Sequence, residues 1–375
     1  MFGRLLRNKR LHSGAGEGGT DAPFVDLSRT PKGVAYRTAG VDLSQYPGAD
    51  ASLSAGDVLG AVAAVRAVRS DLSDAESARI ELQFRHEAFR RTRDSLTRSP
   101  APRPDSPAAA PAGLKEVQAA DLSLADLVAG VRGEGALVVR GLLPALACTN
   151  LRERIDAGLA AFERSGGEPD DRWHVPLADL AGQPLSPVYR ANGYQVFDGQ
   201  VSVADTPLAA SYILQQFENL GLPALVAEYL GIRPALSLEK WTLRRVPPTT
   251  NSSWHQDGAF LGEGVGTLNL WIALSDCGES ASGLDIVAKR FDRIVPTGTE
   301  GAYFDWDVSP AEVETSRGSS PVVSPVFQPG DAVFFDHFLL HRTGLAPHMT
   351  HDRYALESWF FDPQRFPERY AGLLV

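Results

Sequence analysis

The spacing of hydrophobic residues along the chain is helical in its first part and strand-like after about residue 236. Apolar side chains at three- and four-residue intervals predict helices over residues 144–164 and 207–230. Residues 135–141 form a short apolar run typical of a buried strand. After residue 236, short apolar runs alternate with turn signals. From about residue 114 onward, the pattern therefore predicts a mainly β domain with flanking helices.

The run at residues 267–274 predicts a strand with two different faces. Side chains alternate across a strand, so one face carries Leu268, Leu270, Ile272 and Leu274. The other face carries Asn269, Trp271 and Ala273. The first set suits core packing. The second set, an amide, an indole and a methyl group, suits the lining of a pocket.

The region before residue 114 has a different composition. Residues 1–53 are polar and turn-rich, so we expect poor order there, whereas residues 55–98 have a helical pattern. A capping box at residues 73–76 opens a helix with Leu82, Phe89 and Leu96 at heptad spacing. This narrow stripe needs a partner, either the following domain or a second copy of the chain.

A proline- and alanine-rich segment at residues 99–113 is typical of a semi-rigid linker. The expected organisation is an N-terminal extension over residues 1–98, this linker, and one sizeable domain over residues 114–375.

Composition narrows the function. A formal net charge of −10 argues against a nucleic-acid partner, because phosphate binding needs clustered Lys and Arg. Two cysteines are too few for a disulfide framework, which favours a reducing, cytoplasmic location. No run of 18 apolar residues is present, so we expect no transmembrane segment, and the basic start lacks the apolar core of a secretory signal.

The tripeptide His255-Gln256-Asp257 is the main candidate for chemistry. If it lies on a strand, His255 and Asp257 project from the same face. One imidazole and one carboxylate, joined by a distant histidine, would make a facial triad for Fe(II) with open positions. The tripeptide alone is a weak signal. Four histidines compete for the third position: His337, His341, His348 and His351.

Six segments in order give the tripeptide a context: residues 254–258 (WHQDG), 268–277 (LNLWIALSDC), 282–287 (SGLDIV), 329–336 (PGDAVFFD), 341–344 (HRTG) and 353–356 (RYAL). In these segments the chain resembles the phytanoyl-CoA dioxygenase family of Fe(II)/2-oxoglutarate oxygenases, over roughly residues 130–362. No single motif is specific, but the ordered set is. One departure is visible: residues 288–291 read Ala-Lys-Arg-Phe where the family usually has a Pro-Gly-Ser-His-like turn, so we expect the lid that follows to be shaped for an unusual substrate.

The resemblance implies a double-stranded β-helix (jelly roll) and a set of roles. His255, Asp257 and His341 would bind Fe(II), because His341 has the family's Thr343 and Arg353 after it. Arg353 would hold the C5 carboxylate of the cosubstrate 2-oxoglutarate, with Thr343 as a second hydrogen bond and Trp271 beside it. With O₂, the enzyme would hydroxylate, desaturate or epoxidise an unactivated C–H substrate. Related halogenases have Ala or Gly in place of Asp257, so halogenation is not expected.

Other residues are weaker candidates for contact with substrate: Lys240, Asn269, Phe260, Arg190, Tyr194 and Phe197. Each also has an ordinary structural explanation. Lys240 suits solvent, Trp271 suits a core, Arg353 suits a surface ion pair and Thr343 suits any strand. The substrate, either a small molecule or a carrier-tethered group, is not identified by the sequence.

Two other classes of function stay open. A cupin-like metal-binding isomerase would use the same ligand types but would not need Arg353 and Thr343. A binding protein without 2-oxoglutarate turnover would not need a complete ligand set. Self-association through the helix at residues 73–98 is a further expectation.

Overall fold

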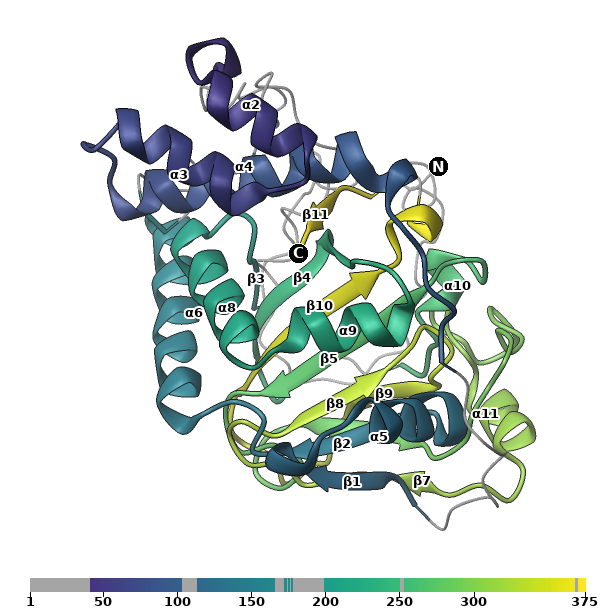
Figure 1. Ribbon diagram of the computed structural model, residues 1–375. Helices are drawn as coiled ribbons and strands as arrows, with labels where there is room; N and C mark the ends of the chain where they lie inside the picture. Colours follow the sequence, from purple (N-terminus) through teal and green to yellow (C-terminus); the bar gives the residue numbers. More distant parts are fainter. Residues whose placement is uncertain are drawn as a thin grey trace. The chain divides into compact units, whose positions relative to one another are not determined.

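The computed structural model describes residues 41–102, 113–165, 172–173, 175, 177, 199–249, 253–367 and 370–375. All of them belong to one compact unit, residues 37–375 (Figure 1). None of the described helices is long and apolar enough to span a membrane.

Two sheets organise the described residues. Along the larger sheet the order is β1 (Lys115–Gln118), β2 (Ala136–Arg140), β8 (Ala332–Phe335), β5 (Thr267–Ala273), β10 (Arg353–Phe361), β4 (Ala235–Val246) and β11 (Gly372–Leu374), and β3 (Gln200–Ser202) pairs with β4. The smaller sheet has the order β7 (Val322–Val323), β6 (Gly283–Val287) and β9 (His341–Gly344). Only β1 and β2 pair in parallel among these strands.

Helices flank the sheets: α2 (Pro47–Ser54), α3 (Val58–Val68), α4 (Asp74–Thr92), α5 (Leu124–Val128), α6 (Ala145–Ser165), α8 (Pro207–Asn219), α9 (Leu222–Leu230), α10 (Gly258–Leu261) and α11 (Pro310–Arg317). A π-helical turn (Ala129–Glu134) and 3-10 turns (Leu43–Gln45, Arg93–Ser95, Ala119–Asp121 and Pro363–Arg365) complete the regular structure. More described residues lie in helices than in strands. The described residues form a mixed, sheet-rich fold with flanking helices, which agrees with the expected sheets and helices, although the helices are a larger part of it than a mainly β fold implies.

Most elements agree with the hydrophobic pattern, with two corrections. The helix expected over residues 207–230 is two helices, because Gly221 adopts the left-handed conformation (φ 66°) between α8 and α9. The expectation of poor order over residues 1–53 is wrong for residues 41–53, because α2 begins at Pro47, a residue preorganised for a first helical turn. Residues 1–40 lie outside the described residues.

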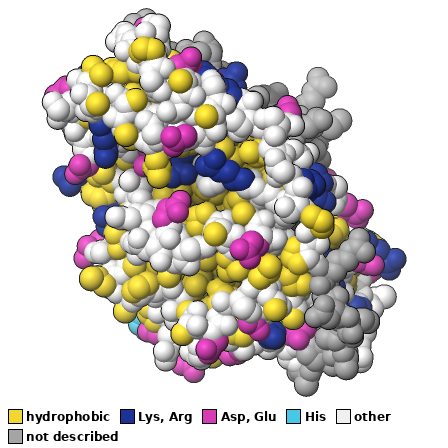
Figure 2. All heavy atoms as spheres, in the orientation of Figure 1, with side chains coloured by type: hydrophobic (Ala, Val, Ile, Leu, Met, Phe, Trp, Pro, Cys, Tyr) yellow, Lys and Arg dark blue, Asp and Glu magenta, His cyan; other side chains and the backbone are white. Residues whose placement is uncertain are grey.

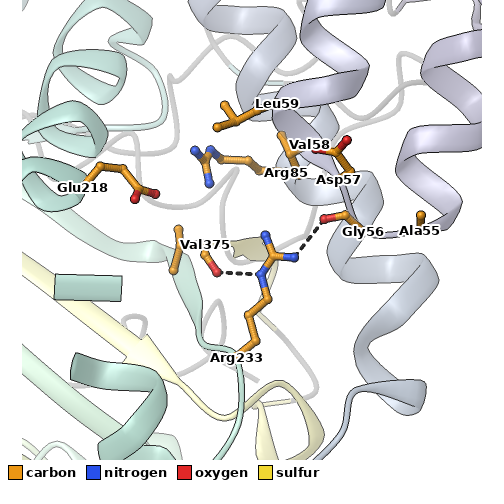
Figure 3. Close-up of a pocket in the computed structure, with 9 residues that line it drawn as sticks. All are labelled: Ala55, Gly56, Asp57, Val58, Leu59, Arg85, Glu218, Arg233 and Val375. Atoms are coloured by element: carbon orange, nitrogen blue, oxygen red, sulfur yellow. Dashed lines mark hydrogen bonds between the residues drawn. The ribbon is translucent and has the colours of Figure 1, made fainter. Parts of the chain in front are cut away.

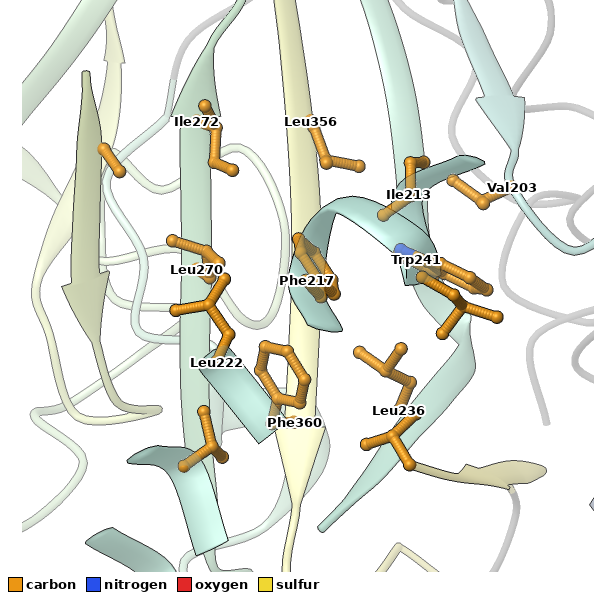
Figure 4. Close-up of a cluster of buried hydrophobic side chains, with 14 of the residues drawn as sticks. Val203, Ile213, Phe217, Leu222, Leu236, Trp241, Leu270, Ile272, Leu356 and Phe360 are labelled. Atoms are coloured by element: carbon orange, nitrogen blue, oxygen red, sulfur yellow. The ribbon is translucent and has the colours of Figure 1, made fainter. Parts of the chain in front are cut away.

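The outer face of the larger sheet packs against α8 and α9. Leu270 and Ile272 from β5 and Phe360 from β10 meet Phe217 and Leu222 from these helices (Figure 4). The rings of Phe217 and Phe360 have centroids 5.7 Å apart. This apolar layer confirms the core face predicted for residues 267–274.

The inner face of the larger sheet packs against the smaller sheet. Trp271 and Ala273 from β5 and Phe335 from β8 form a second buried cluster with Leu284 and Ile286 from β6. The other face predicted for residues 267–274 therefore lies between the two sheets, where the candidate chemistry is found.

Helix α4 packs onto α8 and β11. Its capping box is present: the backbone N–H of Ser73 donates to Glu76 at 2.9 Å, and the backbone N–H of Glu76 donates to the Ser73 hydroxyl at 3.3 Å. The Arg85 guanidinium donates to the Leu374 carbonyl on β11 at 3.0 Å, and the stripe residues Leu82 and Phe89 are buried. The partner of the stripe is therefore within the chain, so the pattern does not by itself require a second copy.

The expected division of the chain at residues 99–113 stays a prediction, since residues 103–112 lie outside the described residues. The start of this segment is bound to the rest of the chain. The backbone N–H of Ser99 donates to the Gly231 carbonyl at 2.7 Å.

Candidate functional site

Two of the three expected ligands, His255 and His341, lie directly opposite each other on two paired backbone segments. His255 and His341 form an isolated antiparallel bridge, exchanging N–H···O=C hydrogen bonds of 2.9 and 3.0 Å. Their ring centroids are 4.5 Å apart. A hydrogen-bonded antiparallel pair of this kind fixes the separation of the two side chains, so backbone pairing explains how residues 86 positions apart share one site.

Asp257 reaches the site by a turn rather than by a strand. Only Trp254 and His255 are paired as in a strand, and Asp257 has helical dihedrals (φ −61°, ψ −25°) at the start of α10. The expected strand through Asp257 is therefore corrected. Gly258 fixes this turn: its N–H donates to the His337 carbonyl at 2.8 Å, and a Cβ there would lie 3.0 Å from that oxygen.

The three side chains converge. One ligand atom each from His255, Asp257 and His341 lies within 4.8 Å of the others, and Asp257 Oδ2 is 3.8 Å from His341 Nε2. Asp257 Oδ2 is buried and has no hydrogen-bond partner among the described residues. An unpaired buried carboxylate oxygen is costly, and a cation bound between the three groups would remove that cost.

The two imidazoles have the tautomer that metal binding needs. Nδ1 of His255 lies 3.0 Å from the Ser253 carbonyl, and Nδ1 of His341 lies 3.1 Å from the Leu339 carbonyl. Because a carbonyl only accepts, each Nδ1 carries the proton and each Nε2 keeps its lone pair. Burial, helped by the neighbouring His341, lowers the pKa of His255 to about 4, so its ring is neutral near pH 7.

The competing histidines lie elsewhere. His337 is buried, but its Nδ1 lies 2.9 Å from the Thr267 hydroxyl and its Nε2 lies 3.3 Å from the Glu263 carbonyl. His348 and His351 are exposed. Among the described residues, the group able to hold a metal ion contains His341 and none of these three.

Arg353 opens β10 and points between the sheets. Its side chain is buried (1% exposed), and its Nη1 donates to the Gly283 carbonyl at 2.9 Å. No carboxylate pairs with it among the described residues, and its buried Nε has no partner there. Burial lowers the pKa of Arg353 to about 10, yet the group stays charged near pH 7. This cation is therefore suited to an anionic ligand.

Thr343 and Trp271 flank the path from the triad to Arg353. Thr343 lies two residues after His341 on β9, so both project from the same face of that strand. Thr343 pairs with Leu284, the neighbour of Gly283. The Arg353 guanidinium carbon lies 5.9 Å from the centre of a Trp271 ring.

Asn269 is a further buried polar group on the inner face of β5. It is 0% exposed, and neither its amide oxygen nor its amide nitrogen has a partner among the described residues. Such a group is costly unless a ligand satisfies it.

Glu357 adds a negative charge to the inner face. Burial would raise its pKa, but Arg244, 2.9 Å away, and Lys240 outweigh that effect and hold the pKa of Glu357 at about 2. The carboxylate is therefore ionised and already paired. Because Glu357 pairs with Arg244, Lys240 has no carboxylate at ion-pair distance among the described residues.

The structure brings together Phe260 and Lys240, two residues that the sequence analysis named separately as candidates for substrate contact. The Lys240 ammonium lies 4.1 Å from the centre of the Phe260 ring. Sequence reasoning missed Trp306, whose indole lies 5.7 Å from the His255 ring and 6.0 Å from the Phe260 ring, measured between centroids. The one available signal was the aromatic run Tyr303, Phe304 and Trp306. Arg190, Tyr194 and Phe197 lie outside the described residues.

A separate hollow lies between the N-terminal helices, Glu218 of α8, Arg233 and Val375 (Figure 3). Figure 2 shows Lys and Arg side chains gathered beneath these helices on the face in view. Arg233 donates to the backbone carbonyls of Gly56 and Val375, both at 2.8 Å, and Arg85 pairs with Glu81 at 2.9 Å. These arginines connect elements of the fold, and the hollow holds none of the triad residues.

Comparison with solved structures found several similar chains. AviO1 from Streptomyces viridochromogenes Tue57 is 22% identical, with 62% of this chain and 92% of that chain covered and a TM-score of 0.40. The non-heme alpha-ketoglutarate-dependent carbocyclase SnoK from nogalamycin biosynthesis is 18% identical (66% and 87% covered, TM-score 0.43). The epimerase SnoN, solved with Fe³⁺, alpha-ketoglutarate and nogalamycin RO, is 19% identical (64% and 83% covered, TM-score 0.39). Sequence identities of 18–22% and TM-scores of 0.39–0.43 are too low to assign the activity or ligands of these proteins to this chain.

Among curated proteins, no relative was found. The family model for phytanoyl-CoA dioxygenase matches residues 131–347, more than half of the chain. This range contains all three residues of the triad, and Arg353 follows it by six positions. The chain belongs to the phytanoyl-CoA dioxygenase family.

Proposed function

We propose that this protein is an Fe(II)- and 2-oxoglutarate-dependent oxygenase that hydroxylates an unactivated C–H bond of a small-molecule or carrier-tethered substrate. The observation that carries the proposal is the combination of two features between the sheets. His255, Asp257 and His341 offer three converging ligand atoms, and Arg353 offers a buried cation without a carboxylate partner among the described residues.

The donor set fits iron. Two neutral imidazoles and one carboxylate on one side of an ion are the ligands of the 2-His-1-carboxylate facial triad, which leaves positions open for a cosubstrate and O₂. When bound there, Fe(II) and 2-oxoglutarate would supply the oxidising power, with succinate and CO₂ as coproducts. The Ser253 and Leu339 carbonyls orient the two imidazoles.

Arg353 is positioned to hold the far end of 2-oxoglutarate. Gly283, which accepts from its guanidinium, precedes Ile286 by three residues, and Ile286 pairs with His341. The guanidinium is therefore anchored roughly 10 Å along the sheet from the third ligand, at about 3.3 Å per residue. Arg353 would hold the far carboxylate of a five-carbon diacid whose other end was held at the triad. The planar guanidinium suits a carboxylate, and Thr343 and Trp271 would complete that end.

Two finer parts of the proposal rest on the residues themselves. The larger and smaller sheets packed face to face support a jelly-roll topology. Asp257 provides the carboxylate whose replacement by Ala or Gly accompanies halogenation in related enzymes, so hydroxylation is the proposed outcome. Asn269 and Lys240 would contact the substrate or cosubstrate from β5 and β4.

The test is succinate formation from 2-oxoglutarate with added Fe(II), ascorbate and O₂. We expect slow succinate release without substrate and faster release with substrates drawn from a small-molecule panel, because substrate binding couples the two half-reactions. Omitting iron or adding a chelator should abolish both. Metal-bound protein that forms no succinate under any of these conditions would favour a cupin-like isomerase or a binding protein.

A further inference from the structure

A row of aromatic side chains leads from the candidate metal site to the surface. Trp306 lies edge-on to His255 (centroids 5.7 Å apart) and edge-on to Phe260 (6.0 Å). Trp306 also stacks on Phe304, with ring centroids 4.8 Å apart and an interplanar angle of 10°. Phe304 in turn meets Tyr303 at 4.6 Å.

The outer members of this row are unusually exposed. Tyr303 is 71% exposed and Phe304 is 44% exposed. Large aromatic surface in water is unfavourable, and when it adjoins a reactive centre it indicates a ligand-binding surface.

The loop that carries the row is fixed to the ligand-bearing segment. The backbone N–H of Val308 donates to the Trp254 carbonyl at 2.8 Å, and the Ser253 hydroxyl donates to Asp307 at 2.9 Å. Asp307 also accepts from the Phe304 N–H at 3.0 Å. Trp306 therefore keeps its position relative to His255 without any ligand, as a preorganised binding site requires.

The inner end of the row carries a positive charge. Lys240 is half-buried, its ammonium lies 4.1 Å from the centre of the Phe260 ring, and it has no carboxylate at ion-pair distance among the described residues. The neighbouring cation Arg244 is already paired with Glu357. A ligand anion would give Lys240 the partner it lacks.

We propose that Trp306, Phe304 and Phe260 form the substrate platform, and that the substrate is a planar apolar molecule with an anionic group held by Lys240. The placement of a substrate C–H bond at the triad rests on the proposed function, whereas binding of the substrate to the platform does not. The ring system of the substrate would stack along the aromatic row, with its anionic group directed toward Lys240 and one of its C–H bonds directed toward the triad.

The test measures binding of simple probes by calorimetry. Protein loaded with Zn(II) and saturating 2-oxoglutarate is titrated with 2-naphthoate, with 2-naphthylmethanol as the uncharged probe and cyclohexanecarboxylate as the non-aromatic anion. The cosubstrate occupies Arg353, so that the probe anion does not bind there. We expect 2-naphthoate to bind at least about tenfold more tightly than either of the other probes.

Two variants separate the parts of the platform. Trp306→Ala should weaken 2-naphthoate binding about tenfold, because a stacking contact is lost. Lys240→Met, which keeps the stem but not the charge, should weaken 2-naphthoate by a similar factor and leave 2-naphthylmethanol unchanged. Leu146→Ala, at an apolar residue that is 73% exposed on α6, is the control and should change neither.

If Trp306→Ala does not fold, as judged by circular dichroism, Phe304→Ala replaces it, since that ring is largely at the surface. The proposal is overturned if the wild type does not bind 2-naphthoate. It is also overturned if the affinity of the platform variants for 2-naphthoate stays within about twofold of the wild-type value. A 2-oxoglutarate titration of the same protein reports on the proposed function separately, so the two failures are distinguishable.

Discussion

His341→Ala should abolish turnover and reduce metal affinity by more than the roughly 10–100-fold that loss of an outer-shell partner typically costs. The physical reason is that the triad contributes three protein ligands, and His341 both supplies one of them and lies opposite another, His255. The backbone bridge does not depend on the side chain, so the fold should survive. Metal stoichiometry after dialysis, together with succinate formation, measures the effect.

The matched controls for this variant are two histidines outside the triad. His351→Ala changes an exposed residue and should leave both metal content and turnover intact. His337→Ala removes hydrogen bonds to Thr267 and Glu263, so it should lower stability but not metal content. Activity that persists in His341→Ala but is lost in His337→Ala or His351→Ala would show that the ligand assignment is wrong.

Arg353→Leu should raise the concentration of 2-oxoglutarate needed for half-maximal turnover by about two to three orders of magnitude. Removing the guanidinium leaves the cosubstrate carboxylate buried without a charged partner, at a cost of about 3–5 kcal/mol, and each 1.4 kcal/mol corresponds to about tenfold. Arg353→Lys should fall between, because it keeps the charge but loses the planar fork. A kinetic titration of 2-oxoglutarate measures the change.

Two observations separate this result from unfolding. Metal content should be unchanged, since no ligand is altered. The thermal midpoint of the ligand-free variant should change little, because the loss of the hydrogen bond to the Gly283 carbonyl is offset by the removal of a buried charge that has no carboxylate partner in the described structure. Arg140→Leu is the control for 2-oxoglutarate affinity. Arg140 already pairs with Glu116 and Asp331, so its removal should leave the concentration of 2-oxoglutarate needed for half-maximal turnover unchanged. Unaltered 2-oxoglutarate affinity in Arg353→Leu would mean that another group binds the cosubstrate, or that none is used.

The sequence predicted the parts of the site that lie on regular strands. Alternation placed Asn269 and Trp271 on one face, and the structure puts the Trp271 face of β5 between the sheets. The same principle failed for Asp257, because the strand pairing stops at His255 and a close backbone approach at Gly258 imposes a turn. Both geometries bring the carboxylate beside the imidazole, so the three side chains converge as the proposed ligand set requires, although the backbone at Asp257 was predicted wrongly.

Features that depend on contacts distant in sequence were not predictable. Trp306 lies in a loop without hydrophobic period, and its contacts with His255 and Phe260 come from a bridge between Trp254 and Val308. Strand β1 was missed because Lys115–Gln118 is short and half-exposed, and it exists through its pairing with β2. The pairing of Lys240 with Phe260 also joins separate elements, β4 and α10.

The central claim is that iron and 2-oxoglutarate bind together at the triad, and an anaerobic absorption titration tests it most directly. Chelation of Fe(II) by a 2-oxo acid produces a visible metal-to-ligand charge-transfer band that neither component gives alone. The account predicts that this band saturates at one equivalent of each per chain. It also predicts that Arg353→Leu, with iron still bound, requires about a hundredfold or more additional 2-oxoglutarate to reach the same intensity. Iron bound stoichiometrically without any such band at saturating 2-oxoglutarate would contradict it.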